Sequence, residues 1–297
     1  IFEDKPCRET AWNIDLEYQN KGWDVAEGKV QALEQSAVKG VLRVTRKFNR
    51  SVIVQDITIY RSNPRIDFRT RVDWQETEKM LKAAFFMNVL SRKATYEIQF
   101  GAIERPTHWN TSYDKAKFEV CAHKWADLSE GNYGVSLLND SKYGYDIKDN
   151  RMRITLLRAP VDPDPTADRG IQEFCYSLLP HIGNFRTGET VNAGYELNVP
   201  LLAIAGRVID HNSSYARITG RNVIIDTIKC AEDGRGTIVR AYESNGTRGN
   251  TRIKLSRTPA SVSECNLMEE DEHTVKMERD SFEFHINPFE IKSFRII

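Results

Sequence analysis

Hydrophobic and polar residues alternate with a period of two along much of this chain. The clearest runs are residues 65–74 (RIDFRTRVDW), 95–100 (TYEIQF) and 281–286 (SFEFHI), in which apolar side chains occupy every second position. Successive residues of a β-strand face opposite sides of a sheet, so each of these runs predicts a strand with one buried and one solvated face.

Further runs with strand-like composition are separated by turn-forming residues. The only helix we expect is a short one at residues 125–129, because no amphipathic pattern extends beyond about three turns. The chain is therefore predicted to be all-β. The additional strand candidates are residues 40–48, 51–60, 83–90, 133–139, 151–158, 171–179, 189–199, 222–230 and 237–242.

Two domains are predicted, over residues 1–206 and 207–297. Long strands and aromatic loops fill the first part, whereas residues 211–220 (HNSSYARITG) are small and polar, as in an exposed connection. In the second part, the glycine-containing segment 232–236 separates two strand candidates and predicts a hairpin-like pair.

Composition narrows the class of function. The 42 basic and 42 acidic residues cancel, which argues against a nucleic-acid partner. No apolar run approaches the ~18 residues of a membrane-spanning helix. Five irregularly spaced cysteines are typical of reduced thiols, so we expect a cytoplasmic protein. The chain begins at Ile1, and its first residues are typical of the middle of a protein sequence. We therefore expect the chain to be part of a longer protein.

Residues 103–130 form a long polar and aromatic excursion between two strand candidates. Loops of this length usually build a surface or meet a ligand. Aromatic faces stack on sugar rings, and Arg, Asn and Asp bond their hydroxyl groups, so a sugar contact is one interpretation. The candidate residues are Arg105, His108, Trp109, Asn110, Tyr113 and Asp114, together with Tyr143 and Tyr145 around a nearby glycine.

Two other groups of residues could carry chemistry. Cys121 and His123 are natural zinc ligands, but their spacing fits no closed site, so we interpret them as structural. The segment 160–168 holds three carboxylates among three prolines. We expect no catalytic role there and interpret Asp168 and Arg169 as a local ion pair.

Three separated runs resemble the C-terminal half of the α-mannosidases of glycoside hydrolase family 38, of the bacterial and cytosolic-vacuolar type. They are residues 105–146 (RPTHWNTSYDKAKFEV and onward), 156–181 (LLRAPVDPDPTADRGIQEFCYSLLPH) and 223–244 (VIIDTIKCAEDGRGTIVRAYES), and they occur in the family's order. AWNIDLEY at residues 11–18 resembles the family's entry into this β region.

The resemblance implies a galactose-mutarotase-like super β-sandwich followed by a smaller β-sandwich. It implies partner domains that precede it, helical and catalytic, and a zinc ion in the catalytic domain. The full enzymes hydrolyse terminal α-mannosides with retention through a glycosyl-enzyme intermediate. The family's zinc site includes a His-x-Asp pair, and no histidine of this chain is followed two residues later by Asp.

We therefore expect a non-catalytic portion of such an enzyme, with no cofactor of its own. The excursion at residues 103–130 would dock on the missing domains or reach the edge of their sugar site. An autonomous carbohydrate-binding module is the alternative. A mutarotase-like epimerase is a further alternative, with His181 as the acid and Glu173 as the base.

Overall fold

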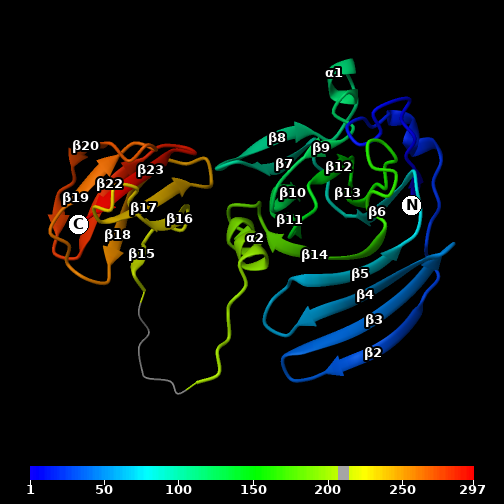
Figure 1. Cartoon of the computed structure of the whole chain (residues 1–297), viewed down its shortest axis with the longest axis horizontal. Helices are drawn as coiled ribbons and strands as arrows, with labels where there is room; N and C mark the ends of the chain where they lie inside the picture. The colour runs from blue at the N-terminus through cyan, green and yellow to red at the C-terminus, as the bar shows by residue number, and fades with distance from the viewer. Residues whose placement is uncertain (207–213) are drawn as a thin grey trace. The chain divides into compact units, whose positions relative to one another are not determined.

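The computed structural model describes residues 1–206 and 214–297. Strands dominate it, as the alternation predicted (Figure 1). The chain divides into two compact units: residues 1–97 with 103–201, and residues 98–102 with 202–297. The predicted boundary at residue 207 and the first three residues of the predicted connection at 211–220 lie outside the described residues.

The first unit is built around a nine-stranded antiparallel sheet with the order β2-β3-β4-β5-β14-β11-β10-β7-β8 (Figure 1). Its strands are β2 (Lys29–Gln35), β3 (Lys39–Phe48), β4 (Ser51–Tyr60), β5 (Ile66–Trp74), β7 (Lys93–Ile98), β8 (Gly101–Pro106), β10 (Trp125–Ser129), β11 (Tyr133–Asn139) and β14 (Gly170–Ile182).

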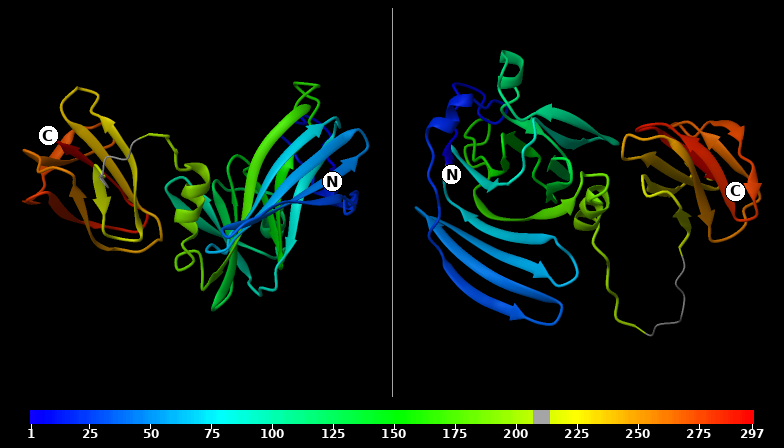
Figure 2. Two further views of the ribbon diagram at one scale, coloured as in Figure 1. Left: turned by 90° about the horizontal axis from the view of Figure 1, so that it is seen from below. Right: turned by 180° about the vertical axis from the view of Figure 1, so that it is seen from behind.

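A second sheet of five strands has the order β1-β6-β13-β12-β9. Figure 2 shows the long strands of the larger sheet from two further directions. The strands of the second sheet are β1 (Phe2–Glu3), β6 (Lys79–Phe86), β9 (Val120–Cys121), β12 (Gly144–Lys148) and β13 (Arg151–Leu157). The short helices of this unit are η1 (Leu16–Asn20), α1 (Ser112–Lys115) and α2 (Thr190–Asn198).

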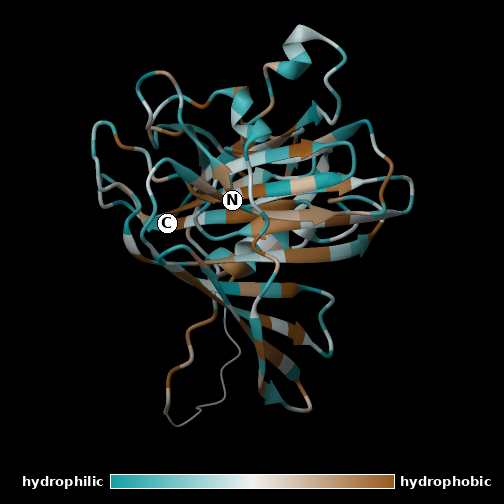
Figure 3. Ribbon diagram, turned by 90° about the vertical axis from the view of Figure 1, so that its right-hand side faces the viewer, coloured by the Kyte–Doolittle hydropathy of each residue, from teal (hydrophilic) through white to brown (hydrophobic). Residues whose placement is uncertain are grey.

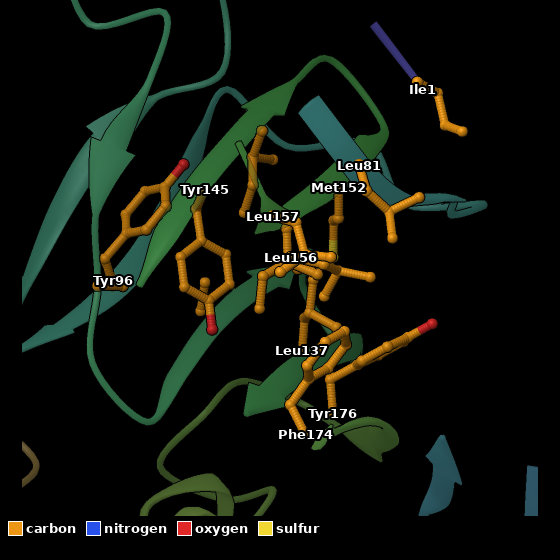
Figure 4. Close-up of a cluster of buried hydrophobic side chains, with 14 of the residues drawn as sticks. Ile1, Leu81, Tyr96, Leu137, Tyr145, Met152, Leu156, Leu157, Phe174 and Tyr176 are labelled. Carbon is orange, nitrogen blue, oxygen red and sulfur yellow. The ribbon is translucent and has the colours of Figure 1, made fainter. Parts of the chain in front are cut away.

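The core of the first unit is made of side chains from both of its sheets (Figure 4). Trp74 of β5 and Leu137 of β11 are fully buried, as are Met152 and Ile154 of β13. Figure 3 shows hydrophobic and hydrophilic residues as brown and teal bands along the ribbons. Burial of apolar surface between the two sheets is the main stabilising term of such a sandwich.

The second unit also contains two sheets, with the orders β15-β18-β22-β21 and β16-β17-β23-β19-β20. The predicted hairpin at 232–236 joins β16 to β17. The run 281–286 follows the prediction, because Phe282, Phe284 and Ile286 are buried and the residues between them are exposed. The strands are β15 (Ala216–Ile218), β16 (Val223–Cys230), β17 (Thr237–Glu243), β18 (Gly249–Leu255), β19 (Val262–Cys265), β20 (Asp271–Thr274), β21 (Met277–Glu278), β22 (Ser281–Ile286) and β23 (Ile291–Ile296).

Several local expectations were wrong. Residues 125–129 form strand β10, not a helix, because they pair with both β11 and β7. Residues 190–198 form helix α2, not a strand. Asp67, expected on a solvated face, is buried, where its carboxylate accepts hydrogen bonds from Tyr60 and Ser177, each at 2.7 Å.

Two general expectations concern redox state and membranes. None of the five cysteines takes part in a disulfide bond. Within residues 1–206 and 214–297, no helix has both the length and the apolar character needed to cross a bilayer.

Candidate functional site

The excursion at residues 103–130 comprises strand β8, a loop with one helical turn, and strands β9 and β10. The helical turn α1 begins at a capping box, in which the Thr111 hydroxyl accepts from the Asp114 amide at 3.1 Å and the Asp114 carboxylate accepts from the Thr111 amide at 3.2 Å. This reciprocal pair fixes the local backbone. Asp114 therefore has a structural role in the turn.

A cleft of about 710 Å³ lies beside this excursion. Its volume falls within the range of small-molecule sites. Of the sequence-predicted residues, His108 and Asn110 line it. Its other lining residues are mostly polar: Asn88, Val89, Leu90, Ser91, Arg92, Thr107, Glu130, Asp149 and Asn150.

Hydrogen bonds between loops hold the walls of this cleft. Glu130 accepts from the Leu90 amide at 2.7 Å, and Thr107 donates its hydroxyl to the Ser91 carbonyl at 2.7 Å. The Asp149 amide donates to the Thr107 carbonyl at 2.7 Å. Because these contacts connect segments far apart in the sequence, the cleft is preorganised by the fold.

Two of the predicted residues contact neighbours within the unit. The Lys148 ammonium lies 3.8 Å from the centre of the Trp109 ring, and the Arg105 guanidinium lies 4.8 Å from that of Tyr96. Both arrangements are cation–π contacts. The rings and cations proposed for sugar recognition are thus already partnered by the protein.

The remaining aromatic candidates lie in contrasting environments. Tyr113 on α1 is 82% exposed and Tyr143 is 51% exposed, with the latter ring packed edge-on against His123. Tyr145 is completely buried, receives a hydrogen bond from Asn139, and contributes its ring to the core (Figure 4). Burial raises the pKa of Tyr145 well above its ordinary value.

A buried ion cluster that was not predicted from the sequence joins residues of β6, β12 and β13. The Lys82 ammonium contacts Glu119 and lies 2.7 Å from the Asp146 carboxylate, to which the Arg153 guanidinium also donates at 2.7 Å. Tyr18 donates to Glu119 at 2.5 Å. We call these five residues the Lys82 cluster.

The electrostatics of the Lys82 cluster follow from burial and charge. Burial raises the pKa of Glu119, although Lys82 opposes the shift. Burial acts in the same direction on Asp146, but Lys82 and Arg153 outweigh it and hold the pKa of that carboxyl below its ordinary value. Because both carboxylates are engaged by buried cations, the cluster is suited to structure and not to proton transfer.

A second buried group contains His181, Asp127 and Ser136. The His181 Nε2 atom lies 2.7 Å from the Asp127 carboxylate and 3.1 Å from the Ser136 hydroxyl. A nucleophilic triad needs the carboxylate and the hydroxyl on different ring nitrogens, and here both contact the same one. This group therefore lacks the geometry of an acyl-transfer site.

The arrangement of β14 also argues against an epimerase site at His181 and Glu173. The two residues are eight positions apart on the same face of one strand, which separates them by roughly 27 Å. Glu173 instead pairs with Arg71 at the surface. The two side chains cannot meet on one sugar.

The remaining acid and metal candidates are engaged locally. Asp168 accepts from the backbone amides of Arg158 and Ala159 at 2.9 and 3.0 Å, so the expected ion pair with Arg169 is replaced by backbone capping. Hydrogen bonds from the Thr166 amide, which has the larger effect, and from the Thr166 hydroxyl lower the pKa of Asp164. In the described part of the chain, no three His, Cys, Asp or Glu residues gather to hold a metal ion, so zinc has no fitting ligand set there.

Comparison with known proteins agrees with this architecture. Residues 1–166 match the glycosyl hydrolases family 38 C-terminal domain, and residues 222–294 match the C-terminal beta sandwich domain of the same family. A two-part all-β region of a glycosyl hydrolase is thus the class defined by the fold. The chain belongs to glycosyl hydrolase family 38.

The relatives are considerably longer than this chain. It is 38% identical to alpha-mannosidase G of Dictyostelium discoideum and 35% identical to alpha-mannosidase 2C1 of Homo sapiens, in each case over 100% of this chain. It spans 28% and 30% of those two proteins. The crystal structure of an alpha-mannosidase from Enterococcus faecalis V583 has the same fold, with a TM-score of 0.75, 14% identity and coverage of 91% of this chain and 35% of that one.

Proposed function

We propose that this chain is the non-catalytic C-terminal β portion of a retaining, zinc-dependent α-mannosidase that hydrolyses terminal α-mannosides. The observation that carries the proposal is the similarity along the whole chain to proteins named alpha-mannosidase, of which it spans only 28% and 30%. Catalysis and zinc binding are assigned to the preceding domains of the longer protein.

The engagement of the carboxylates supports a non-catalytic role. Retaining glycosidases use two carboxyl groups about 5–5.5 Å apart on either side of the scissile bond. Glu119 and Asp146 are two closely spaced acids, and both are bound to Lys82. A sugar could reach neither carboxylate without breaking the Lys82 cluster.

The excursion at residues 103–130 is proposed to meet the catalytic and helical domains and to contribute to the edge of the sugar site. The exposure of Tyr113 and the polar cleft at His108 and Asn110 support a role in contacts. The reduced cysteines support the proposal that the protein acts in the cytoplasm.

Activity measurements test whether catalysis resides in the domains that precede this chain. We expect the 297-residue chain to release no chromophore from an aryl α-mannoside in the presence of zinc, whereas the full-length protein does. Turnover by the chain alone would show that the catalytic groups lie within it. Inactivity of the full-length protein towards α-mannosides would refute the assignment of the reaction.

The polar cleft favours one alternative, an autonomous carbohydrate-binding module. Calorimetric titration of the chain with mannose and mannobiose distinguishes it from the supporting role. Saturable binding that is lost on Asn110→Ala would favour the module, and a flat isotherm at millimolar sugar would exclude it. Tyr143→Ala serves as the control, because Tyr143 is exposed but does not line the cleft.

A further inference from the structure

Strand β6 has one open edge in the described part of the chain. Its residues Leu81–Phe86 pair with β13 on one side, but on the other side only Lys79 and Met80 pair, with β1. The backbone groups of residues 82–86 on that side make no other backbone hydrogen bond. An open edge of this kind is a template for another strand.

The open edge of β6 forms one wall of a space that lies beyond the N-terminal end of β1. Residues 1–3 lie between two neighbours: β6 on one side, and residues 21–23 on the other, through hydrogen bonds of Ile1 with Trp23 and of Glu3 with Lys21. Continued backwards, the line of β1 would pass between residues 82–86 and residues 24–28. Neither of these segments has a backbone partner on the facing side.

A groove of about 310 Å³ occupies this space. Asp24 and Val25 line it on one side, and Ala83 and Phe85 of β6 on the other. Its floor is contributed by the larger sheet and is mostly apolar and aromatic, with Ile53, Gln55, Ile57, Phe68 and Tyr176 among the lining residues.

An apolar strip extends along the larger sheet from this floor. Leu42, Ile57 and Phe68 are cross-strand neighbours on β3, β4 and β5 and therefore share one face. Of these, Leu42 is 47% exposed, and Ile59, two positions after Ile57 on the same face, is 56% exposed. Exposed apolar side chains that adjoin one another on a sheet face are typical of an interaction surface.

The start of the chain lies at the mouth of the groove. Ile1 is 7% exposed, packs in the core, and donates from its terminal amine to the Trp23 carbonyl at 2.8 Å.

From this geometry we propose that the polypeptide preceding Ile1 in the longer protein continues β1 as a strand, pairs with the open edge of β6 and fills the groove. The relatives supply a reason for choosing this occupant. The matched region is a C-terminal domain and accounts for 28% and 30% of their length, so a long polypeptide precedes it in them. The inference rests on the proposed function only in requiring such a preceding segment.

The register of β1 makes the proposal specific. Phe2 lies opposite Met80 on one side and opposite Gly22 on the other. In antiparallel pairing, the residue two positions before Ile1 would therefore lie between Ala83 and Val25, both of which line the groove. We expect that residue to be apolar, and a charged residue there would contradict the register.

Hydrogen exchange at β6 tests the pairing directly. The chain is prepared with the roughly six residues that precede Ile1 in the longer protein, enough to span residues 82–86 at about 3.3 Å per residue. A Gly-Ser extension of equal length is the control. We expect exchange of the 82–86 backbone amides to slow at least tenfold with the native extension only, because about half of them face the open edge.

Matched substitutions on β6 separate the groove from the rest of the strand. Ala83 lines the groove, whereas Phe86, further along β6, does not line it and is 75% exposed. In the extended chain, Ala83→Asp should abolish the protection and Phe86→Asp should preserve it. If Ala83→Asp fails to fold, as judged by tryptophan fluorescence, the comparison of the native and Gly-Ser extensions by itself tests the pairing with β6.

Two results would overturn the inference. One is equal exchange with the native and Gly-Ser extensions. The other is protection of the unextended chain that rises with protein concentration, which would identify a second copy of the chain as the occupant. The readout needs no catalysis, so loss of α-mannosidase activity in the full-length protein would refute the proposed function while leaving this pairing intact.

Discussion

Replacing Asp146 by Asn should destabilise the first unit strongly. The Asp146 side chain is 4% exposed and accepts from the Lys82 ammonium and the Arg153 guanidinium, each at 2.7 Å. Asn keeps the shape but removes the charge, so Lys82 keeps Glu119 as its anionic partner, whereas Arg153 loses the carboxylate and keeps the Tyr18 hydroxyl. The substitution thereby tests whether the Lys82 cluster holds β6, β12 and β13 together.

The expected magnitude is about 3 kcal/mol. Removing one partner of a buried ion pair costs about 3–5 kcal/mol, and the Asn carbonyl retains one hydrogen bond, which places the value at the lower end. The control is Glu104→Gln, which removes an ion pair with Lys93 whose side chains are 48% and 62% exposed. That change should cost about 0–1 kcal/mol.

Urea unfolding followed by tryptophan fluorescence is the appropriate assay. All five tryptophans lie at positions 12, 23, 74, 109 and 125, which belong to the first unit, so the signal does not report on the second. Asp146→Asn should lower the urea midpoint by roughly 1 M. A change no larger than that of Glu104→Gln would refute the view that the cluster is a buried structural element.

The pH dependence provides an internal check on the same variant. Against the opposing effect of burial, Lys82 and Arg153 hold the pKa of Asp146 below its ordinary value. Its contribution to stability is therefore complete above the pKa of the unfolded chain and is lost as pH falls through the lower folded value. The difference between wild type and Asp146→Asn should narrow on acidification, and a difference that widens would contradict this sign.

Two further predictions concern packing and the second unit. Gly134→Ala should cost about 1–3 kcal/mol in the same urea assay, because its Cβ would clash with Ser129 and His181, whereas Gly131→Ala should be nearly neutral because nothing lies within 4 Å. Carboxyl NMR should show Asp233 titrating at about 2, since hydrogen bonds from Arg235 lower its pKa. Its stabilising effect would be present above its unfolded pKa and lost as pH falls through about 2, and a midpoint near 4 would contradict this assignment.

The sequence predicted those strands that have one buried and one solvated face. Strand β22 is such a case, because its phenylalanines and its polar residues alternate as the sheet requires. Strand β10 was missed because Trp125, Ala126, Asp127 and Leu128 are all buried, which removes the alternation. A short run without a period cannot be assigned to helix or strand before its neighbours are known.

The candidate site was predicted only in part for a similar reason. His108 and Asn110 line a cleft because the loop that carries them packs against residues 88–92 and 149–150, which no local pattern indicates. The exposed Tyr113 and the buried Tyr145 both satisfied the same residue-type argument. Residue type identified aromatic candidates, but only tertiary packing decides which of them reach the surface.

The ion cluster connects the candidate excursion to the open edge of β6. Lys82 of β6 contacts Glu119, which belongs to residues 103–130, and Lys82 also lines the groove beside Ala83 and Phe85. Glu119 thus helps to fix the strand on which we propose that the preceding polypeptide pairs. If both ideas hold, Glu119→Gln should weaken the protection of residues 82–86 given by the native extension, although Glu119 does not line the groove. Unchanged protection would mean that the excursion and the open edge act independently.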